Sequence, residues 1–185
     1  MLDGWAIDTF WPTIPSTMTT DAAPHLFSAS VETLLARADE LCAKRHVRLT
    51  ALRRQILGLM LEANAPLGAY DLLQRLQAIQ GNAAPPTVYR TLEFLMEFGL
   101  IHKIERLSAF MPCTHTLGRA PCHEHDADCV HASQFLICRN CSSVTELEDP
   151  TILASIVAAS QKSGFRLQHT TVEVEGLCAK CVALA

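Results

Sequence analysis

The residues best suited to chemistry in this 185-residue chain are two Cys-x-x-Cys pairs, Cys138 with Cys141 and Cys178 with Cys181. Two intervening residues let both sulfurs of a pair turn toward one ion, and four thiolates make a closed tetrahedral zinc site. Thiolates are soft ligands, which favour zinc or an iron–sulfur cluster over magnesium or calcium. The pairs predict a structural zinc that joins two chain segments. The alternative is two unrelated pairs, one of them a redox dithiol.

A second group of metal-capable side chains lies between His102 and Glu146. It is larger than one four-ligand site needs, and its members are Cys113, His115, Cys122, His123, His125, Cys129 and His131. Imidazole, thiolate and carboxylate together are ligands that zinc accepts. This group predicts a second ion that is bound differently from the first.

Composition narrows the class of protein. The chain has eight cysteines but no N-terminal basic region followed by an apolar run, so we expect a cytoplasmic protein with reduced, metal-bound thiols. No apolar run approaches the roughly 18 residues of a membrane span. The net charge is −4, yet residues 41–106 carry nine Lys/Arg against five Asp/Glu, and the rest of the chain from residue 107 carries five against eight. A basic part followed by an acidic part is compatible with nucleic-acid contact by the first half only.

The elements that must position these groups begin after a leader, residues 1–28, which we expect to be disordered. Met18 is an alternative start. Apolar residues at helical spacing predict helices from Ser28 or Ser30 to residue 45, from Thr50 to about residue 64, over 70–79, and from Pro85 to Gly99. Strand-like segments at 100–106 and 109–113 follow. Helices followed by a two-stranded hairpin are the order of a winged helix-turn-helix domain, which we place at 29–112.

The second half is expected to be a small α/β unit. Residues 112–131 form a polar loop in which Cys and His are frequent, and a hinge loop is assigned to 113–132. Strands at 133–137 and 144–147 flank the first cysteine pair, and the alternating strand at 165–175 leads to the second. Between them Pro150 opens a helix to about residue 163, whose expected buried residues are Ile152, Ile156, Val157 and Ala159. We assign 133–185 as a dimerisation and metal-binding domain, which makes the fold class α+β.

Several motifs in one order resemble the ferric uptake regulator family, and within it the zinc-uptake regulator branch. Those of the first half are Arg48-Leu49-Thr50, Tyr70-Asp71-Leu72-Leu73, Pro85-Pro86-Thr87-Val88-Tyr89-Arg90-Thr91-Leu92 and Phe98-Gly99-Leu100-Ile101-His102-Lys103. Those of the second half are Phe135-Leu136-Ile137-Cys138-Arg139-Asn140-Cys141 and Gly176-Leu177-Cys178-Ala179-Lys180-Cys181. The resemblance covers roughly residues 29–182.

The resemblance implies a homodimeric, metal-dependent repressor that binds double-stranded operator DNA and silences zinc-uptake genes. Its first half would bind DNA and its second half would dimerise. Two zinc ions per chain are expected. One is structural, in the four-cysteine site, and the other is regulatory, with ligands carried over as His102, Cys113, His131 and Glu146. An iron, manganese or peroxide sensor of the same family is the alternative.

A recognition helix meets base edges near its N-terminal end, which in the fourth helix carries Thr87, Tyr89 and Arg90. Arg90 is the candidate for a bidentate guanine contact or a phosphate clamp, and Tyr70 would reach DNA from the preceding helix. Phosphate contacts, which position without reading sequence, are expected from Arg48, Arg53, Arg54 and Lys103.

The interval from Cys113 to His131 is longer than the branch pattern. His115, His123 or Cys129 could replace one of the four sensing ligands, and Cys122, His123, His125 and Cys129 could hold a third, weaker zinc. An enzyme is disfavoured. A zinc deaminase needs His-x-Glu and Pro-Cys-x-x-Cys, whereas Glu124 follows His123 directly and Ile137 precedes Cys138. We expect no small-molecule substrate and no membrane partner.

Overall fold

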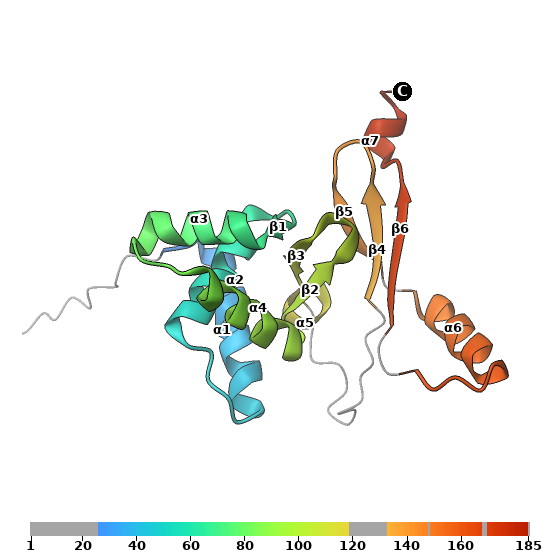
Figure 1. Ribbon diagram of the computed structural model, residues 1–185, viewed down its shortest axis with the longest axis horizontal. Helices are drawn as coiled ribbons and strands as arrows, with labels where there is room; N and C mark the ends of the chain where they lie inside the picture. Colours follow the sequence, from blue (N-terminus) through green and yellow to red (C-terminus); the bar gives the residue numbers. More distant parts are fainter. Residues whose placement is uncertain (1–25, 119–132, 148, 168–169, 185) are drawn as a thin grey trace, which may run out of the picture.

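A computed structural model describes residues 26–118, 133–147, 149–167 and 170–184 of the chain. Helices at the N-terminal side and a tall three-stranded sheet at the C-terminal side are joined by a hairpin between them (Figure 1). Within the described residues, no helix has the length and apolar character needed to cross a bilayer.

The N-terminal side is built from four helices, α1 (Ala29–Lys44), α2 (Ala51–Ala63), α3 (Ala69–Gln80) and α4 (Pro85–Glu97). All four agree with the helices predicted from the apolar spacing. Asn64 ends α2 in a left-handed conformation, and two prolines occupy the first turn of α4, where a missing N–H costs no helical hydrogen bond. The helices enclose a core of fully buried side chains that includes Leu35, Ile56, Leu76, Leu92 and Leu95.

The described residues begin at Leu26, three residues inside the predicted leader of residues 1–28. Phe27 lies so close to Gly58 of α2 that a Cβ atom at Gly58 would come within 2.3 Å of the Phe27 ring. The Ser28 hydroxyl donates to the Glu62 carboxylate at 3.1 Å. Residues 26–28 are therefore packed on α2, and the rest of the predicted leader lies outside the described residues.

The hairpin is shorter than predicted and has a third strand. Strand β2 (Ile101–Ile104) and strand β3 (Ala109–Pro112) pair antiparallel, and the turn between them is a 3₁₀ helix, η1 (Glu105–Leu107). The two-residue strand β1 (Leu67–Gly68) pairs with the other edge of β3. Strand β1 was not predicted, because two residues are too few to show an alternating pattern.

The second sheet has the order β5-β4-β6. Strand β4 (Ser133–Cys138) pairs antiparallel with β5 (Val144–Leu147) and parallel with β6 (Thr171–Gly176). The parallel pair needs a crossover connection, which contains α6 (Pro150–Lys162). The strand predicted from residue 165 begins at Thr171, which pairs with Ser133, the first described residue of β4.

The hairpin is shared by both halves of the molecule. Leu100, Ile101 and Phe110 belong to the helical core on one side. On the other side Ile104, with Leu107 and Met111 beside it, packs against Phe135 and Ile137 of β4. The inner face of the second sheet thus takes much of its apolar cover from the hairpin, and any change in the angle between the halves must pass through this contact.

Two further short helices were not predicted. Helix α5 (Thr114–Gly118) begins the segment that we expected to be a loop, because Leu117 is anchored in the helical core. Helix α7 (Ala179–Val182) carries the second cysteine pair. The remaining part of the expected loop, residues 119–132, lies outside the described residues.

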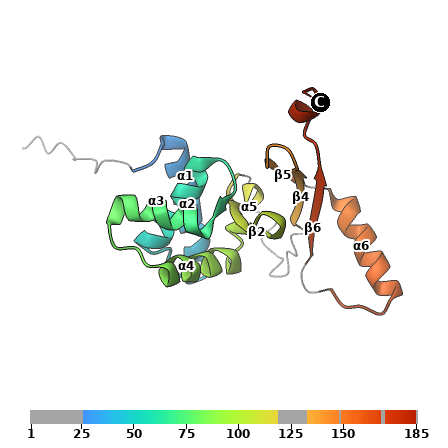
Figure 2. The same cartoon turned by 45° about the horizontal axis from the view of Figure 1, so that its top comes forward.

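The predicted burial of α6 is wrong for the single chain. Ile152, Ile156 and Val157 are only half-buried and Ala159 is exposed, and the helix has no buried residue. Figure 2 shows α6 extending away from the sheet beside β6. The apolar spacing correctly identified a helix, but the described part of the chain covers its apolar residues only in part.

Candidate metal centres and nucleic-acid interface

The structure gathers the four cysteines of the two pairs at one end of the second sheet. Cys138 ends β4, Cys141 lies in the turn before β5, Cys178 precedes α7 and Cys181 lies within it. Their sulfurs all lie within 4.8 Å of one another, and the Sγ atoms of Cys141 and Cys178 are 3.7 Å apart. Four sulfurs each about 2.3 Å from a central zinc would be about 3.8 Å apart. The arrangement fits a tetrahedral zinc.

The protonation of this cluster shows why it suits a cation. The backbone N–H of Cys178 donates to Sγ of Cys138 at 3.3 Å and lowers the pKa of Cys138 to about 6. The pKa of Cys181 rises to about 12: the Asn140 contact lowers it, but burial and the other three sulfurs outweigh that contact. Without an ion, neighbouring thiolates repel one another. A divalent cation removes that repulsion, because it favours the deprotonated form of each ligand.

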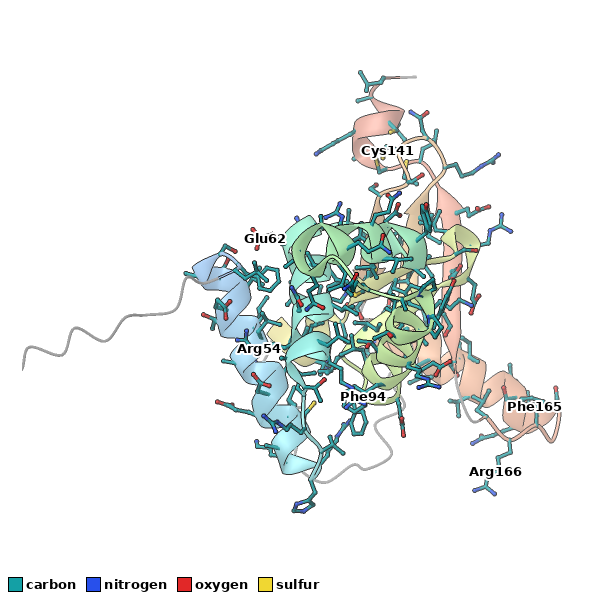
Figure 3. All side chains as sticks on the ribbon, turned by 60° about the vertical axis from the view of Figure 1, so that its left-hand side comes forward. Arg54, Glu62, Phe94, Cys141, Phe165 and Arg166 are labelled. Atoms are coloured by element: carbon teal, nitrogen blue, oxygen red, sulfur yellow. The ribbon has the colours of Figure 1, made fainter. Side chains whose placement is uncertain are left out.

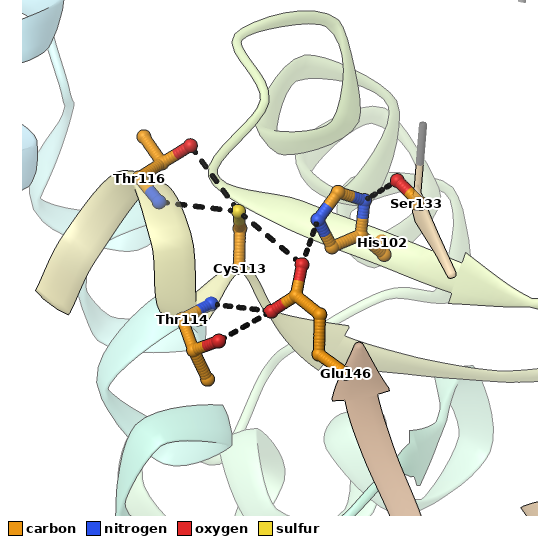
Figure 4. A network of polar contacts seen from close by, with 6 residues as sticks. All are labelled: His102, Cys113, Thr114, Thr116, Ser133 and Glu146. Atoms are coloured by element: carbon orange, nitrogen blue, oxygen red, sulfur yellow. Dashed lines mark hydrogen bonds and ion pairs between the residues drawn. The ribbon is translucent and has the colours of Figure 1, made fainter. Parts of the chain in front are cut away.

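A second, mixed cluster lies where the two halves meet. It contains His102 of β2, Cys113 at the end of β3 and Glu146 of β5, and its ligand atoms also lie within 4.8 Å of one another. His102 Nε2 is 3.1 Å from Glu146 Oε1, and Cys113 Sγ is 3.9 Å from the same oxygen (Figure 4). Two ligands come from the hairpin side and one from the second sheet.

The electrostatics of the mixed cluster are those of a buried charge pair. Burial alone lowers the pKa of His102, but the contacts with Cys113 and Glu146 outweigh it and raise the pKa to about 9. Burial raises the pKa of Glu146, but the contacts with His102 and Thr114 outweigh it and lower the pKa to about 2. In the metal-free protein near neutral pH, the pair is therefore an imidazolium facing a carboxylate.

The geometry of His102 indicates that an ion belongs between these groups. Nε2 is buried and, despite its short distance from Glu146, makes no hydrogen bond of good geometry with a described residue. A buried polar atom without a well-aligned partner is costly. One imidazole nitrogen, one sulfur and one carboxylate oxygen are ligands of the kinds that zinc takes. The three side chains fit a zinc ion.

The mixed cluster borders a cleft of about 650 Å³ between the helical half and the second sheet. Cys113 and Glu146 form part of its wall, and Met60, Pro66 and Val144 are among the apolar residues that line the remainder. Solvent can therefore approach the buried ligands from this side, as an exchangeable ion requires.

Of the four predicted sensing ligands, the structure brings three together. The fourth, His131, lies outside the described residues, as do the alternative ligands Cys122, His123, His125 and Cys129. His115, another alternative, lies in α5 and is not part of the three-residue group.

Sequence reasoning missed the side chains that hold these ligands. Ser133, Thr114 and Thr116 all make polar contacts with a ligand of the mixed cluster (Figure 4). Their position within three residues of Cys113 or His131 in the chain is the only sequence signal that pointed to them, and it is weak, because Ser and Thr are common in loops.

The predicted DNA-contacting residues divide into exposed and engaged groups. Tyr70 at the start of α3 is 68% exposed and Tyr89 of α4 is 54% exposed. Arg90 and Arg48 are also exposed, and Thr87 is half-buried in the first turn of α4. Tyr70, Tyr89 and Arg90 lie on α3 and on the first turns of α4, the two helices that would form a helix-turn-helix.

Three of the predicted phosphate contacts are occupied by the protein itself. Arg53 stacks its guanidinium 3.5 Å from the centre of the Phe94 ring. Arg54 bonds the Glu32 and Asp39 carboxylates of α1 at 2.7 and 3.1 Å. Lys103 forms an exposed ion pair with Glu105 at 2.7 Å. Arg53 therefore packs α2 against α4, and Arg54 joins α2 to α1.

Comparison with known proteins agrees with this architecture. Residues 44–175 match the sequence model of the Ferric uptake regulator family. The zinc uptake regulation protein of Escherichia coli (strain K12) is 38% identical over 153 residues, which are 83% of this chain and 84% of that protein.

Solved structures show the same similarity. A structure described as a zinc uptake regulator complexed with zinc and DNA aligns with a TM-score of 0.74 at 36% identity, and covers 85% of this chain and 98% of that one. The crystal structure of holo XcZur aligns with a TM-score of 0.69 at 38% identity, over 82% of this chain and 98% of that one. Because the family model matches more than half of the chain and a relative is 38% identical over most of its length, the chain belongs to the ferric uptake regulator family.

Proposed function

We propose that this protein is a zinc-responsive transcriptional repressor that binds operator DNA as a zinc-loaded homodimer and silences zinc-uptake genes. Members of its family are transcription regulators and not enzymes. One observation carries the proposal: ligands from the DNA-binding side and from the second sheet converge in one cluster at their junction.

A zinc ion in the mixed cluster would tie β2, β3 and β5 together. Because β2 and β3 also pack into the helical core, the ion would fix the angle at which α3 and α4 are presented to DNA. Metal binding can shift a population of domain angles only by its preference for one of them. A cluster that is complete only when the halves are in this orientation has that preference. His131 is the proposed fourth ligand, supported by the position of Ser133, two residues later, against His102.

Zinc is favoured over iron or manganese by the ligand types. Cys113 supplies a soft sulfur, and the cluster holds one carboxylate among its three described ligands. Manganese and magnesium prefer sites rich in oxygen, whereas thiolate selects zinc. The structure with a TM-score of 0.74 is a zinc uptake regulator complexed with zinc and DNA, which supports the same choice.

The four-cysteine cluster is proposed to hold a second zinc with a structural role. It joins the end of β4 to α7 and so closes the second sheet at the end opposite α6 (Figure 1). We therefore propose two zinc ions per chain. The extra ligands between residues 119 and 130 leave a third as an alternative for metal analysis to decide.

DNA binding is proposed for the surface formed by α3 and the first turns of α4. Tyr70, Tyr89 and Arg90 supply exposed groups there, with Thr87 at the edge and Arg48 beside α2. A structural relative was solved with both zinc and DNA, which supports the assignment. Arg90 is the proposed base or phosphate contact, since a guanidinium can bond both edges of guanine.

Dimerisation is proposed for the outer side of the second half. Leu136 and Val174 are neighbours across β4 and β6, and are 44% and 49% exposed. The apolar residues of α6 also lack cover, and Phe165 projects beyond its end, far from Cys141 (Figure 3). An apolar face of this extent that one chain leaves uncovered fits a self-complementary contact with a second copy.

The test is operator binding against buffered free zinc. A labelled promoter fragment from a zinc-uptake gene is titrated with protein that carries one zinc per chain, and anisotropy is read as free zinc rises. We expect binding to tighten at least a hundredfold, with one further zinc taken up per chain. Iron or manganese at matched free concentrations should not replace zinc. Equal operator affinity with and without the exchangeable ion would refute the proposal.

An Arg90→Ala variant separates the two activities. It should take up the exchangeable zinc normally and lose about 1–3 kcal/mol of operator affinity, the usual contribution of a good base contact. Thr33→Val, on α1, is a matched surface control, since the Thr33 hydroxyl bonds only its own helix.

A further inference from the structure

Each ligand of the mixed cluster is held by a hydroxyl-bearing residue that is not itself a ligand. Ser133 Oγ lies 2.9 Å from His102 Nδ1, the Thr116 backbone N–H donates to Cys113 Sγ at 3.3 Å, and the Thr114 backbone N–H donates to Glu146 Oε2 at 3.0 Å. The Thr114 hydroxyl donates to the same carboxylate oxygen. Figure 4 shows that these contacts surround the cluster on its outer side.

Ser133 determines which nitrogen of His102 faces the cluster. When Nδ1 carries the proton and donates it to Ser133 Oγ, the lone pair of Nε2 points toward Glu146 and Cys113. The partner of one ring nitrogen fixes the tautomer and the orientation of the ring, and so prepares the other nitrogen for metal. The ring is held further by its edge-on contact with Phe135, at 5.4 Å between centres.

Thr114 determines how Glu146 presents its carboxylate. Both donors of Thr114 act on Oε2, whereas Oε1 is the oxygen that faces His102 Nε2 and Cys113 Sγ. A carboxylate with one oxygen occupied in this way offers the other as a single-oxygen ligand. That keeps the coordination number low, as tetrahedral zinc requires, and opposes the higher numbers that manganese takes.

The two contacts cross the junction in opposite directions. Ser133, on β4 of the second half, holds the histidine of the hairpin, and Thr114, next to the hairpin, holds the glutamate of the second half. Rotating one half against the other would therefore misalign two ligands at once, even before their own distances changed greatly.

We infer that Thr114 and Ser133 are positioning residues that set the zinc affinity and zinc preference of the mixed cluster, by orienting Glu146 and His102 across the junction of the two halves. This rests on the proposed zinc site, and goes beyond it by assigning roles to two residues that do not contact the ion. Thr116 contacts Cys113 in two ways: its backbone N–H, which substitution does not remove, donates to Sγ at 3.3 Å, and its hydroxyl oxygen accepts from the thiol at 3.2 Å.

The test compares Thr114→Val and Ser133→Ala with wild type in the full-length protein that keeps its four-cysteine zinc. Zinc is titrated into the mixed cluster in competition with a chromophoric chelator, and cobalt(II) spectra report the geometry. Loss of an outer partner commonly costs 10- to 100-fold in metal affinity. We expect such a loss in both variants, weaker tetrahedral cobalt bands, and for Thr114→Val a smaller preference for zinc over manganese. Thr114→Ser should restore the wild-type values.

A matched control is Thr151→Val. Thr151 donates its N–H and its hydroxyl to the Asp149 carboxylate at 2.8 and 2.6 Å, which is the same contact remote from the cluster. Its zinc affinity should stay within twofold of wild type, and the melting temperatures of all the metal-depleted variants should agree within a few degrees. This agreement separates a positioning role from a general loss of structure.

The outcomes distinguish this inference from the proposed function. Zinc affinity and cobalt spectra of Thr114→Val and Ser133→Ala that match wild type would overturn the inference and leave zinc-dependent repression intact. Weakened zinc binding in these variants, in a protein whose operator affinity ignores zinc, would support the inference and contradict the repressor.

Discussion

The two clusters differ in what they join. The four-cysteine cluster lies wholly within the second half, between β4, its turn and α7. The mixed cluster takes ligands from both halves and is bordered by a cleft of about 650 Å³. Four sulfurs close a zinc site completely, whereas mixed ligands leave it more open to exchange. The comparison suggests that one ion maintains a fold and the other reports a concentration.

The distribution of apolar residues explains why the second half would need a structural metal ion. The helical half has a large core of its own, but the second sheet buries chiefly Phe135 and Ile137, which pack against the hairpin. A small unit with little core of its own usually depends on metal, disulfides or a partner. The second half has four sulfur ligands that could hold a metal, and the incompletely covered apolar residues of α6 could bind a partner.

The largest effect should come from removing one ligand of the four-cysteine cluster. Cys138→Ser or Cys178→Ser removes a thiolate that the other three cannot replace, so we expect loss of the tightly bound zinc, of the dimer and of cooperative melting of the second half. Analytical ultracentrifugation and thermal melting measure these changes.

Cys42→Ala is the control for this experiment, because Cys42 is buried in the helical core, away from both clusters. It should keep its full zinc content and its dimer. A Cys138→Ser protein that melts and dimerises as wild type would remove the distinction between the two clusters.

The next largest effect should come from the mixed cluster. His102→Ala or Cys113→Ser removes one of few ligands at an exchangeable site, so zinc-dependent operator binding should fall at least a hundredfold. The dimer and the zinc of the four-cysteine cluster should remain, because neither residue contacts that cluster. Zinc content by mass spectrometry and operator anisotropy test both halves of this statement. A variant that also loses its dimer would show that the mixed cluster is structural too.

The sequence carried enough to predict most of the architecture. The helices α1 to α4, the hairpin and the strands around Cys138 follow from apolar spacing and from Pro and Gly at their ends. The convergence of the four cysteines followed from their spacing, since each pair can turn toward one ion. These features are local, or depend on two local features meeting.

What the sequence could not supply depended on tertiary contact. Strand β1 exists because β3 has a free edge beside it, and α5 exists because Leu117 reaches the helical core. The sequence predicts a DNA contact for Arg54, but it could not show that two carboxylates of α1 bond the Arg54 guanidinium. Ser133 and Thr114 gained importance only when the two halves were brought together.

Proton competition offers a gentler way to separate the clusters. Zinc ligands must be deprotonated, and the pKa of His102 in the metal-free protein is raised to about 9. Between pH 7 and 8.5 the zinc affinity of the mixed cluster should therefore rise about tenfold per pH unit from His102 alone, and level off above pH 9. The four-cysteine zinc should stay at one per chain throughout. Competition titrations at several pH values measure the slope, and a flat profile would show that His102 is not a ligand.

The same pair sets a stability window in the metal-free protein. The raised pKa of His102 gives a stabilisation that is complete below its ordinary value of 6.5 and is lost as the pH rises through about 9. The lowered pKa of Glu146 gives one that is complete above its ordinary value of 4.5 and is lost as the pH falls through about 2. Metal-depleted protein should therefore gain most from this pair between about pH 4.5 and 6.5. A His102→Gln variant, measured by thermal melting, should lack this dependence.

The smallest effect tests whether the mixed cluster acts alone. At the hairpin turn, Glu173 of β6 accepts the backbone N–H groups of Glu105 and Arg106 at 2.7 and 3.1 Å, and the Arg106 guanidinium bonds Glu175 at 3.0 and 2.7 Å. These contacts join the two halves without any metal ligand.

Because the ion pair is exposed and screened by salt, Arg106→Ala should raise the free zinc needed for half-maximal operator binding by no more than about fivefold. The shift should be larger at low salt than at high salt. Lys44→Ala, which removes an exposed positive charge from the last turn of α1 at a residue not expected to contact DNA, is the control for the electrostatic part. A shift of a hundredfold from Arg106→Ala would mean that the turn holds the halves together as much as the zinc does. The comparison of the four-cysteine cluster with the mixed cluster would then have to include a third connection, which contains no metal.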